Sequence, residues 1–170
     1  MVFIPILYRL KSGRFVNRYT IFEKKEYYWI RKLNKNLTIN QRKYAERRLK
    51  ELYDLTLNKT AVGKNFVGID KNLTGHLNNP NKVRYGVCSR VRNDGRINLN
   101  LFMPLNYKEI EKGHQMKISA QNGSIPEHAV EVKSQRIDID SLALDIGFNN
   151  PKSRVLTKEE LKKLKKLSKY

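Results

Sequence analysis

Cations recur at helical spacing between residues 39 and 58 of this 170-residue chain. Lys43, Arg47 and Lys50 are separated by four and three residues, which places them on one face of an expected helix. Three like charges on one face repel each other, and no run of acidic residues at matching spacing neutralises them. A phosphate backbone would supply the missing negative charge. The alternative is an ordinary solvated face, whose long side chains cover the rim of the core.

A predicted hairpin in the middle of the chain adds a second group of cations. Asn93-Asp94-Gly95 is a strong turn signal between strands expected over residues 83–92 and 96–103. Alternation along these strands predicts one packed apolar face and one cationic, amide-rich face suited to phosphate. We expect Tyr85, Val87, Val91, Ile97, Leu99, Leu101 and Met103 on the packed face, and Arg84, Arg90, Arg92, Asn98 and Asn100 on the cationic face, with Arg96 beside it.

The N-terminal region predicts another hairpin. Its strands are expected over residues 2–10 and 14–22, with Lys11-Ser12-Gly13 as a short loop. Cations crowd around the tip of this hairpin, and we expect them to contact phosphate as well. They are Arg9, Lys11, Arg14 and Arg18.

Aromatic residues stand beside cations in residues 23–36, where the apolar spacing becomes helical. Tyr28 and Trp29 come just before Arg31 and Lys32. Bases of single-stranded nucleic acid stack on aromatic rings that have cations nearby. Tyr28 and Trp29 are therefore candidate stacking residues, with Arg31 and Lys32 as phosphate contacts. The alternative is that the rings point into the core.

A lysine-rich helix is expected at the C-terminus. Thr157 and Glu160 have the spacing of a capping box, and the three leucines that follow form a narrow apolar seam. Lysine dominates over arginine here, which favours point-charge attraction to a phosphate backbone over recognition of bases. An anionic membrane surface or an acidic protein partner is the alternative. The candidate contacts in this helix are Lys162, Lys163 and Lys166.

A carboxylate and a lysine two residues apart, Glu131 and Lys133, lie on an expected strand. The Glu131-Val132-Lys133 triplet resembles the E-x-K motif of restriction-type nucleases of the PD-(D/E)xK class. The resemblance implies that Glu131 binds Mg²⁺ and that Lys133 helps to activate water. The class also uses an upstream metal-binding aspartate, whereas Asp94 is explained here by its turn. Alternating Glu and Lys on a surface strand would give the same triplet.

Other reactive side chains show no recognisable arrangement. His76, His114 and His128 have no metal-ligand spacing, although acid–base work by a pair of them, as in a metal-independent ribonuclease, stays open. The single cysteine, Cys88, excludes an intramolecular disulfide framework and a multi-cysteine zinc site. Neither a P-loop nor a dinucleotide-binding glycine pattern occurs. No cofactor is expected, apart from Mg²⁺ if the nuclease alternative holds.

These segments predict an α+β fold. We expect an antiparallel, hairpin-built sheet that could close into a barrel, a long basic amphipathic helix and the C-terminal lysine-rich helix. Residues 1–150 should form one domain and residues 151–170 a basic helical tail. The long helix should begin at the capping box of Thr38 and Gln41. Its buried stripe should contain Ala45, Leu49, Leu52, Tyr53 and Thr56.

The overall charge points to a polyanionic partner. The chain has 35 Lys plus Arg against 16 Asp plus Glu, a formal net charge of +19. Residues 1–60 carry +10 and residues 151–170 carry +6, whereas residues 108–150 carry −2. No apolar run approaches the ~18 residues of a membrane span, and the start lacks the basic region of a secretory signal. We therefore expect a cytoplasmic protein, in the host cytoplasm if its gene is viral.

The predicted function is non-catalytic binding of RNA or DNA through the phosphate backbone, alone or within a larger assembly such as a ribosome-like or virion particle. One alternative is a Mg²⁺-dependent nuclease that uses Glu131 and Lys133. Another is a phage or mobile-element protein that binds or inhibits a nucleic-acid-processing complex. Protein components of such a complex would then be partners as well.

Overall fold

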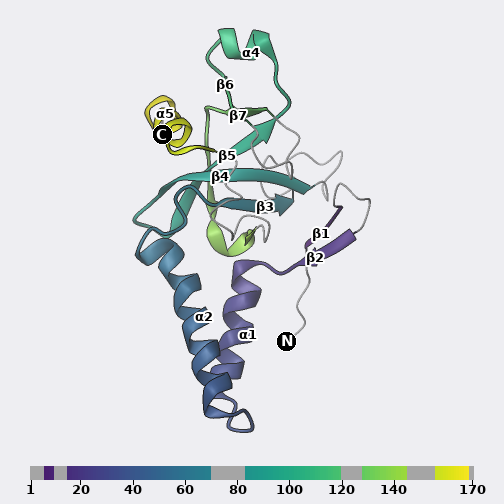
Figure 1. Ribbon diagram of the computed structural model, residues 1–170, viewed down its shortest axis with the longest axis vertical. Coiled ribbons are helices and arrows are strands. Elements are labelled where there is room, and N and C mark those ends of the chain that lie inside the picture. The colour runs from purple at the N-terminus through teal and green to yellow at the C-terminus, as the bar shows by residue number, and fades with distance from the viewer. Residues whose placement is uncertain (1–5, 10–14, 70–82, 120–127, 145–155, 169–170) are drawn as a thin grey trace.

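The computed structural model describes residues 6–9, 15–69, 83–119, 128–144 and 156–168. Within these residues the fold is mixed α+β, as predicted, with helices on an antiparallel sheet (Figure 1). The elements are β1 (Ile6–Arg9), β2 (Phe15–Arg18), α1 (Ile21–Leu33), α2 (Ile39–Leu57), β3 (Asn65–Ile69), β4 (Val83–Val91), β5 (Arg96–Met103), α4 (Tyr107–Glu111), β6 (Gln115–Lys117), β7 (Ala129–Glu131), β8 (Gln135–Asp138), the 3-10 turn η1 (Ile139–Ser141), β9 (Ala143–Leu144) and α5 (Lys158–Leu167).

The main sheet has seven strands in the order β6-β7-β5-β4-β3-β9, and β8 also pairs with β5. The sheet is open, so the expectation that it could close into a barrel is wrong. β5 is its central strand. One edge of β5 pairs with β4, and the other pairs with β8 and then with β7. The separate sheet of β1 and β2 confirms the N-terminal hairpin, although its loop lies outside the described residues.

Helices α1 and α2 form an antiparallel pair. Each begins at a capping box: Thr20 with Glu23 opens α1, and Thr38 with Gln41 opens α2 as predicted. The strand expected over residues 14–22 is therefore too long, because β2 ends at Arg18 and Thr20 already caps a helix. We call the unit formed by α1 and α2 the helical hairpin.

One end of the helical hairpin is anchored to the sheet. The Ile21 amide donates to the Leu142 carbonyl at 2.8 Å, and the Lys25 ammonium pairs with Asp140 at 2.7 Å. Ile21, Leu52 and Leu55 pack into the main core cluster together with residues of β4, β5 and β8. Leu55 occupies the place in the buried stripe that was predicted for Tyr53, which is instead partly exposed. From this anchor the two helices extend side by side away from the sheet (Figure 1).

Helix α5 packs against the opposite face of the sheet. Leu164 is fully buried in a second core cluster that contains Val87, Phe102, Met116 and Val130. The predicted capping box is present, because Thr157 accepts from the Glu160 amide at 3.1 Å. The predicted boundary between a domain and a tail falls within residues 145–155, outside the described residues. β5 is thus covered on both faces.

A β-bulge changes the predicted faces of the central hairpin. The register between β4 and β5 shifts between Cys88 and Arg90. Val91 therefore packs in the main cluster with Cys88, while Val87 packs beneath α5. The predicted amide-rich surface is wrong as well, because Asn98 and Asn100 are completely buried under the α5 side of the sheet.

The remaining elements are short. α4 is a single helical turn, and β6 pairs antiparallel with β7. The strand expected to hold both Glu131 and Lys133 ends at Glu131, so Lys133 lies in the bend before β8. No helix of the described residues is long and apolar enough to cross a membrane.

Candidate nucleic-acid interface

The three cations of the α2 face project from the helical hairpin. Lys43, Arg47 and Lys50 are all exposed, while Ala45 and Leu49 on the opposite side of the helix are buried. In the described part of the chain none of the three forms an ion pair. This face therefore keeps its positive charge, as the sequence predicted.

An aromatic cluster lies between the two helices of the hairpin. The Trp29 side chain is 41% exposed, and its indole N–H donates to the Tyr53 hydroxyl at 3.2 Å. The Lys32 ammonium lies 4.8 Å from the centre of the Trp29 ring, and the Lys25 ammonium lies 4.6 Å from that of Tyr53. These distances are those of cation–π pairs.

The two predicted stacking residues take different positions. Trp29 reaches the surface, whereas Tyr28 is half-buried and packs against the main core cluster. Tyr28 also hydrogen-bonds to Arg48 and raises the pKa of that guanidinium. Its neighbour Tyr27 is more exposed and has the Arg31 guanidinium 5.5 Å above its ring. Tyr27 is therefore better placed than Tyr28 to meet a ligand.

Two tyrosines of α2 complete this surface and were missed by the sequence reasoning. Tyr44 has the Arg47 guanidinium 5.3 Å above its ring. Tyr53 looked like part of the buried stripe, because its spacing from Leu49 is helical. Only the antiparallel pairing of α1 with α2 brings Tyr53 beside Trp29. Tyr44 and Arg47 are three residues apart in the sequence, as are Trp29 and Lys32. This spacing places a ring beside a cation on a helix, and it was the signal available in the sequence.

The other predicted contacts are spread over the rest of the molecule. Arg90 and Arg96 are exposed on the β4–β5 hairpin, and Arg92 is half-buried there. Lys162, Lys163 and Lys166 are exposed on α5. Arg9 and Arg18 lie in β1 and β2, while Lys11 and Arg14 lie outside the described residues. Most of the predicted contacts that are described thus lie on the helical hairpin or around the β4–β5 turn and α5, while Arg9 and Arg18 lie in the β1–β2 hairpin.

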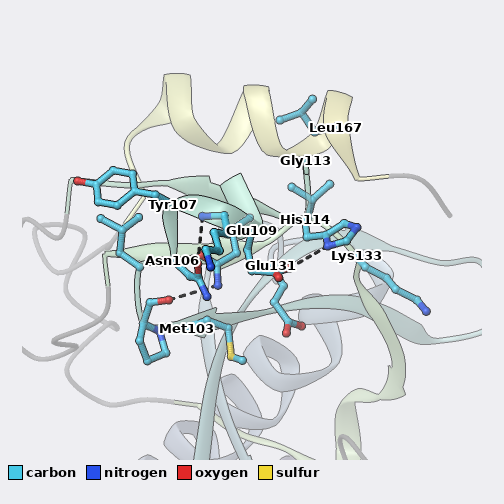
Figure 2. A pocket seen from close by; sticks show the side chains of 14 residues that line it. Met103, Asn106, Tyr107, Glu109, Gly113, His114, Glu131, Lys133 and Leu167 are labelled. Carbon is cyan, nitrogen blue, oxygen red and sulfur yellow. Dashed lines mark hydrogen bonds and ion pairs between the residues drawn. The ribbon is translucent and has the colours of Figure 1, made fainter. Parts of the chain in front are cut away.

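Glu131 and Lys133 line an open cavity of about 1460 Å³ between α4, β6, β7 and the end of α5 (Figure 2). Burial raises the pKa of the half-buried Glu131 carboxyl, against the opposing effect of Arg84 and Lys133. On the same cavity wall, His114 Nδ1 lies 2.8 Å from a Glu109 carboxylate oxygen. This hydrogen bond lowers the pKa of Glu109.

These donors do not fit the Mg²⁺ site that the nuclease resemblance implies. The charged groups that act on Glu131 are two cations, which disfavour a divalent metal ion. In the described ranges no three His, Cys, Asp or Glu residues are grouped so as to hold a metal ion. Cys88 offers no nucleophile either, because burial raises the pKa of its thiol to about 12.

Comparison with known proteins adds no assignment: the chain matches no family model, no curated protein and no solved structure.

Proposed function

We propose that this protein binds nucleic acid without catalysis and that the helical hairpin supplies the main contact surface. The observation that carries the proposal is the pairing of rings and cations on α1 and α2. Four aromatic rings each have a cation 4.6–5.5 Å from the ring centre. All four of these rings, Tyr27, Tyr44, Tyr53 and Trp29, are more than a third exposed.

The chemistry of this surface matches a nucleic-acid strand. Lys43, Arg47 and Lys50 can neutralise successive phosphates, because they face solvent without acidic partners. The neighbouring rings offer π-faces to bases, and stacking needs no particular sequence. A single strand exposes its bases, so the surface fits single-stranded RNA or DNA better than a duplex.

A salt-dependent binding experiment tests this proposal. Wild-type protein is titrated into a labelled single-stranded oligonucleotide of mixed sequence at several salt concentrations, and fluorescence anisotropy gives the affinity. Replacing Lys43, Arg47 and Lys50 with Glu should weaken binding roughly 100-fold at low salt and reduce the log–log salt slope by roughly 2. Circular dichroism should show an unchanged fold, because all three side chains are exposed.

A matched variant separates a local effect from a change in net charge. Replacing Lys108, Lys112 and Lys117 with Glu changes the charge equally but at exposed positions on α4, its C-cap and β6, remote from the helical hairpin (Figure 1). We expect a much smaller loss of affinity, since salt screens distant charges. Equal losses in both variants would remove the helical hairpin from the binding site.

One observation favours a second candidate, a protein partner within a nucleic-acid-processing complex. The end of the helical hairpin farthest from the sheet exposes Ile30, Leu33 and Ile39, of which Leu33 is 68% exposed. Exposed apolar groups of this kind are common at protein interfaces. Purification from native lysate with and without nuclease distinguishes the two. A protein partner that persists after nuclease treatment, and is lost in Leu33→Ser, would favour this candidate.

A further inference from the structure

A second cavity, of about 470 Å³, lies where three segments distant in sequence meet. The turn between α2 and β3 supplies Lys59, the β4–β5 hairpin supplies Arg90 and Arg92, and α5 supplies Lys165. Four cations therefore converge on one concave site. We call it the cationic pocket.

The backbone around the pocket is held in place by specific hydrogen bonds. The Gly63 amide donates to the Cys88 carbonyl at 2.8 Å, and the Cys88 amide donates to the Lys64 carbonyl at 3.0 Å. These bonds tie the α2–β3 turn to β4 next to the bulge. Within that turn Lys59 adopts a φ of 57°, which is uncommon for a residue other than glycine. The lysine is thus placed by the fold and not by a free loop.

Lys59, Arg92 and Lys165 form no ion pair with the described residues. Asp94 is the acidic residue among those that line it, and one of its carboxylate oxygens already accepts from the Arg96 amide at 3.0 Å. Burial raises the pKa of the Cys88 thiol, and the positive charge of Lys165 offsets a small part of that rise. The α5 lysine is therefore close to the bulge. Like charges gathered in this way repel each other unless an anion joins them.

Arg92, which lines the pocket, and Asn98, the strand partner of Arg90, have buried polar atoms without a partner among the described residues. Arg92 Nη1 is buried without a hydrogen-bond acceptor, and Asn98 is completely buried with both side-chain amide atoms unpaired. Asn98 is the register partner of Arg90, so the two side chains leave the same face of the hairpin. Its neighbour Asn100, by contrast, accepts from Ser89 at 2.6 Å and donates to the Glu131 carbonyl at 2.9 Å. Unpaired buried donors are rare, and an ordered water or a bound ion is a common explanation for them.

We propose that the cationic pocket binds a phosphate monoester, and that this group is the terminal phosphate of the nucleic-acid strand. A monoester carries a charge of roughly −1.5 to −2 near neutral pH and three acceptor oxygens, which suits four cations better than an internal diester does. The pocket volume lies within the usual range for small ligands and leaves room for a terminal nucleotide. The choice of a strand end rests on the proposed function.

The test compares oligonucleotides of identical sequence that differ only at their ends. Wild-type protein is titrated with strands of about 12 nucleotides that carry a 5′-phosphate, a 3′-phosphate or hydroxyls at both ends. We expect one phosphorylated strand to bind about tenfold more tightly than the hydroxyl strand, as charge-assisted hydrogen bonds to phosphate predict. Arg92→Gln should abolish this preference. Equal affinity of all three strands for the wild-type protein would overturn the proposal.

Matched variants show whether the preference belongs to the pocket. Lys117→Gln removes an exposed cation of β6 that lies outside the pocket, so the ratio between the strands should stay near that of the wild type. If Arg92→Gln fails to fold, the double variant Lys59→Gln/Lys165→Gln replaces it, because both lysines are exposed. Retention of the full preference in the double variant would contradict the site.

Competition identifies the source of the phosphate. Inorganic phosphate and a free mononucleoside monophosphate are added to the bound phosphorylated strand. Displacement only at concentrations far above that of the strand supports a strand end, while displacement at equal concentration would overturn it in favour of a free nucleotide. Binding of the strand with hydroxyls at both ends tests the proposed function independently of the cationic pocket. If this strand binds with salt dependence but without end preference, the pocket proposal fails and the proposed function stands.

Discussion

The helical hairpin and α5 are both rich in cations but occupy different places in the fold. Helices α2 and α5 both begin at a threonine capping box. Helix α5 buries Leu164 in the core, so its lysines surround a helix that is fixed along the sheet. The helical hairpin is fixed at one end only, and its far end exposes Leu33 and Ile39.

This difference shows what positive charge alone can predict about a helix. Charge repulsion keeps cations at the surface of both regions, so it does not distinguish a helix that covers a sheet from one that projects. The apolar residues do distinguish them. A narrow leucine seam that is matched by a sheet face becomes core, whereas apolar and aromatic residues beyond the reach of the sheet stay exposed and available to a partner.

The largest effect expected from this comparison concerns the core role of α5. Leu164→Ala should reduce the free energy of unfolding by about 2–5 kcal/mol, because a fully buried leucine leaves a cavity. Urea denaturation followed by circular dichroism measures the loss. Leu167→Ala, one helical turn away and 42% exposed, is the control and should cost no more than about 0.5 kcal/mol. Equal costs would mean that α5 lies on the surface as the helical hairpin does.

The next effect concerns the exposed rings of the helical hairpin. Trp29→Ala should weaken binding of a single strand about tenfold and binding of a duplex much less, because a duplex keeps its bases stacked. Trp29 is the single tryptophan of the chain, so its own fluorescence should be quenched when the wild-type protein binds. Tyr107→Ala, at a 66% exposed ring on α4, should leave the affinity unchanged. Unquenched fluorescence on binding would place the strand elsewhere.

The elements of the fold that depend on local sequence could be predicted. The Asn93-Asp94-Gly95 turn joins β4 and β5 as expected, and Gly95 takes the positive φ that such a turn requires. The capping boxes at Thr38 and Thr157 fix the starts of α2 and α5. The Thr20 box was overlooked, because the β-branched and aromatic residues around it favour a strand.

The features that depend on tertiary structure could not be predicted. A bulge at Ser89 reverses which side chains of β4 face each side of the sheet. No residue around Ser89 indicates in the sequence that β4 contains this extra position. Asn98 and Asn100 look like surface residues, yet coverage of β5 by α5 buries them. The cationic pocket brings Lys59 beside Lys165, and it depends on how the α2–β3 turn, the β4–β5 hairpin and α5 pack together. The sequence therefore predicted the cations of one helical face, but not the grouping of cations from different elements.

A smaller effect separates the capping boxes of α2 and α5. In α2, Gln41 accepts from the Thr38 amide at 2.9 Å, and its side chain makes no other hydrogen bond to a described residue. In α5, Glu160 accepts from the Thr157 amide and also from the Ser119 amide after β6, both at 2.9 Å. Glu160→Ala should therefore cost about 1–2 kcal/mol of unfolding free energy, and Gln41→Ala at most about half of that.

The same urea experiment that measures Leu164→Ala measures this pair. The double variant Glu160→Ala/Ser119→Pro is its control, because proline removes the amide that Glu160 accepts from. If the Ser119 contact matters, Glu160→Ala should cost less in the Ser119→Pro background than in the wild type. Equal costs in the two backgrounds would reduce Glu160 to an ordinary cap, equivalent to Gln41.

The smallest effect is a pH dependence on the side of the molecule where α5 lies. Burial raises the pKa of Glu131, so its ionisation opposes folding, and wild-type stability is lost as pH rises from the ordinary glutamate value of about 4.3 through the raised one. Glu131→Gln removes this loss and should gain stability relative to the wild type over that range.

Glu109 has a lowered pKa, so the stability of Glu109→Gln relative to the wild type should change in the opposite direction. The variant should lose relative stability as the Glu109 carboxylate forms in the wild type. Melting temperatures of the three proteins across roughly pH 3 to 7, which covers glutamates with lowered and with raised pKa values, should therefore diverge. Parallel curves would show that neither carboxyl is linked to folding.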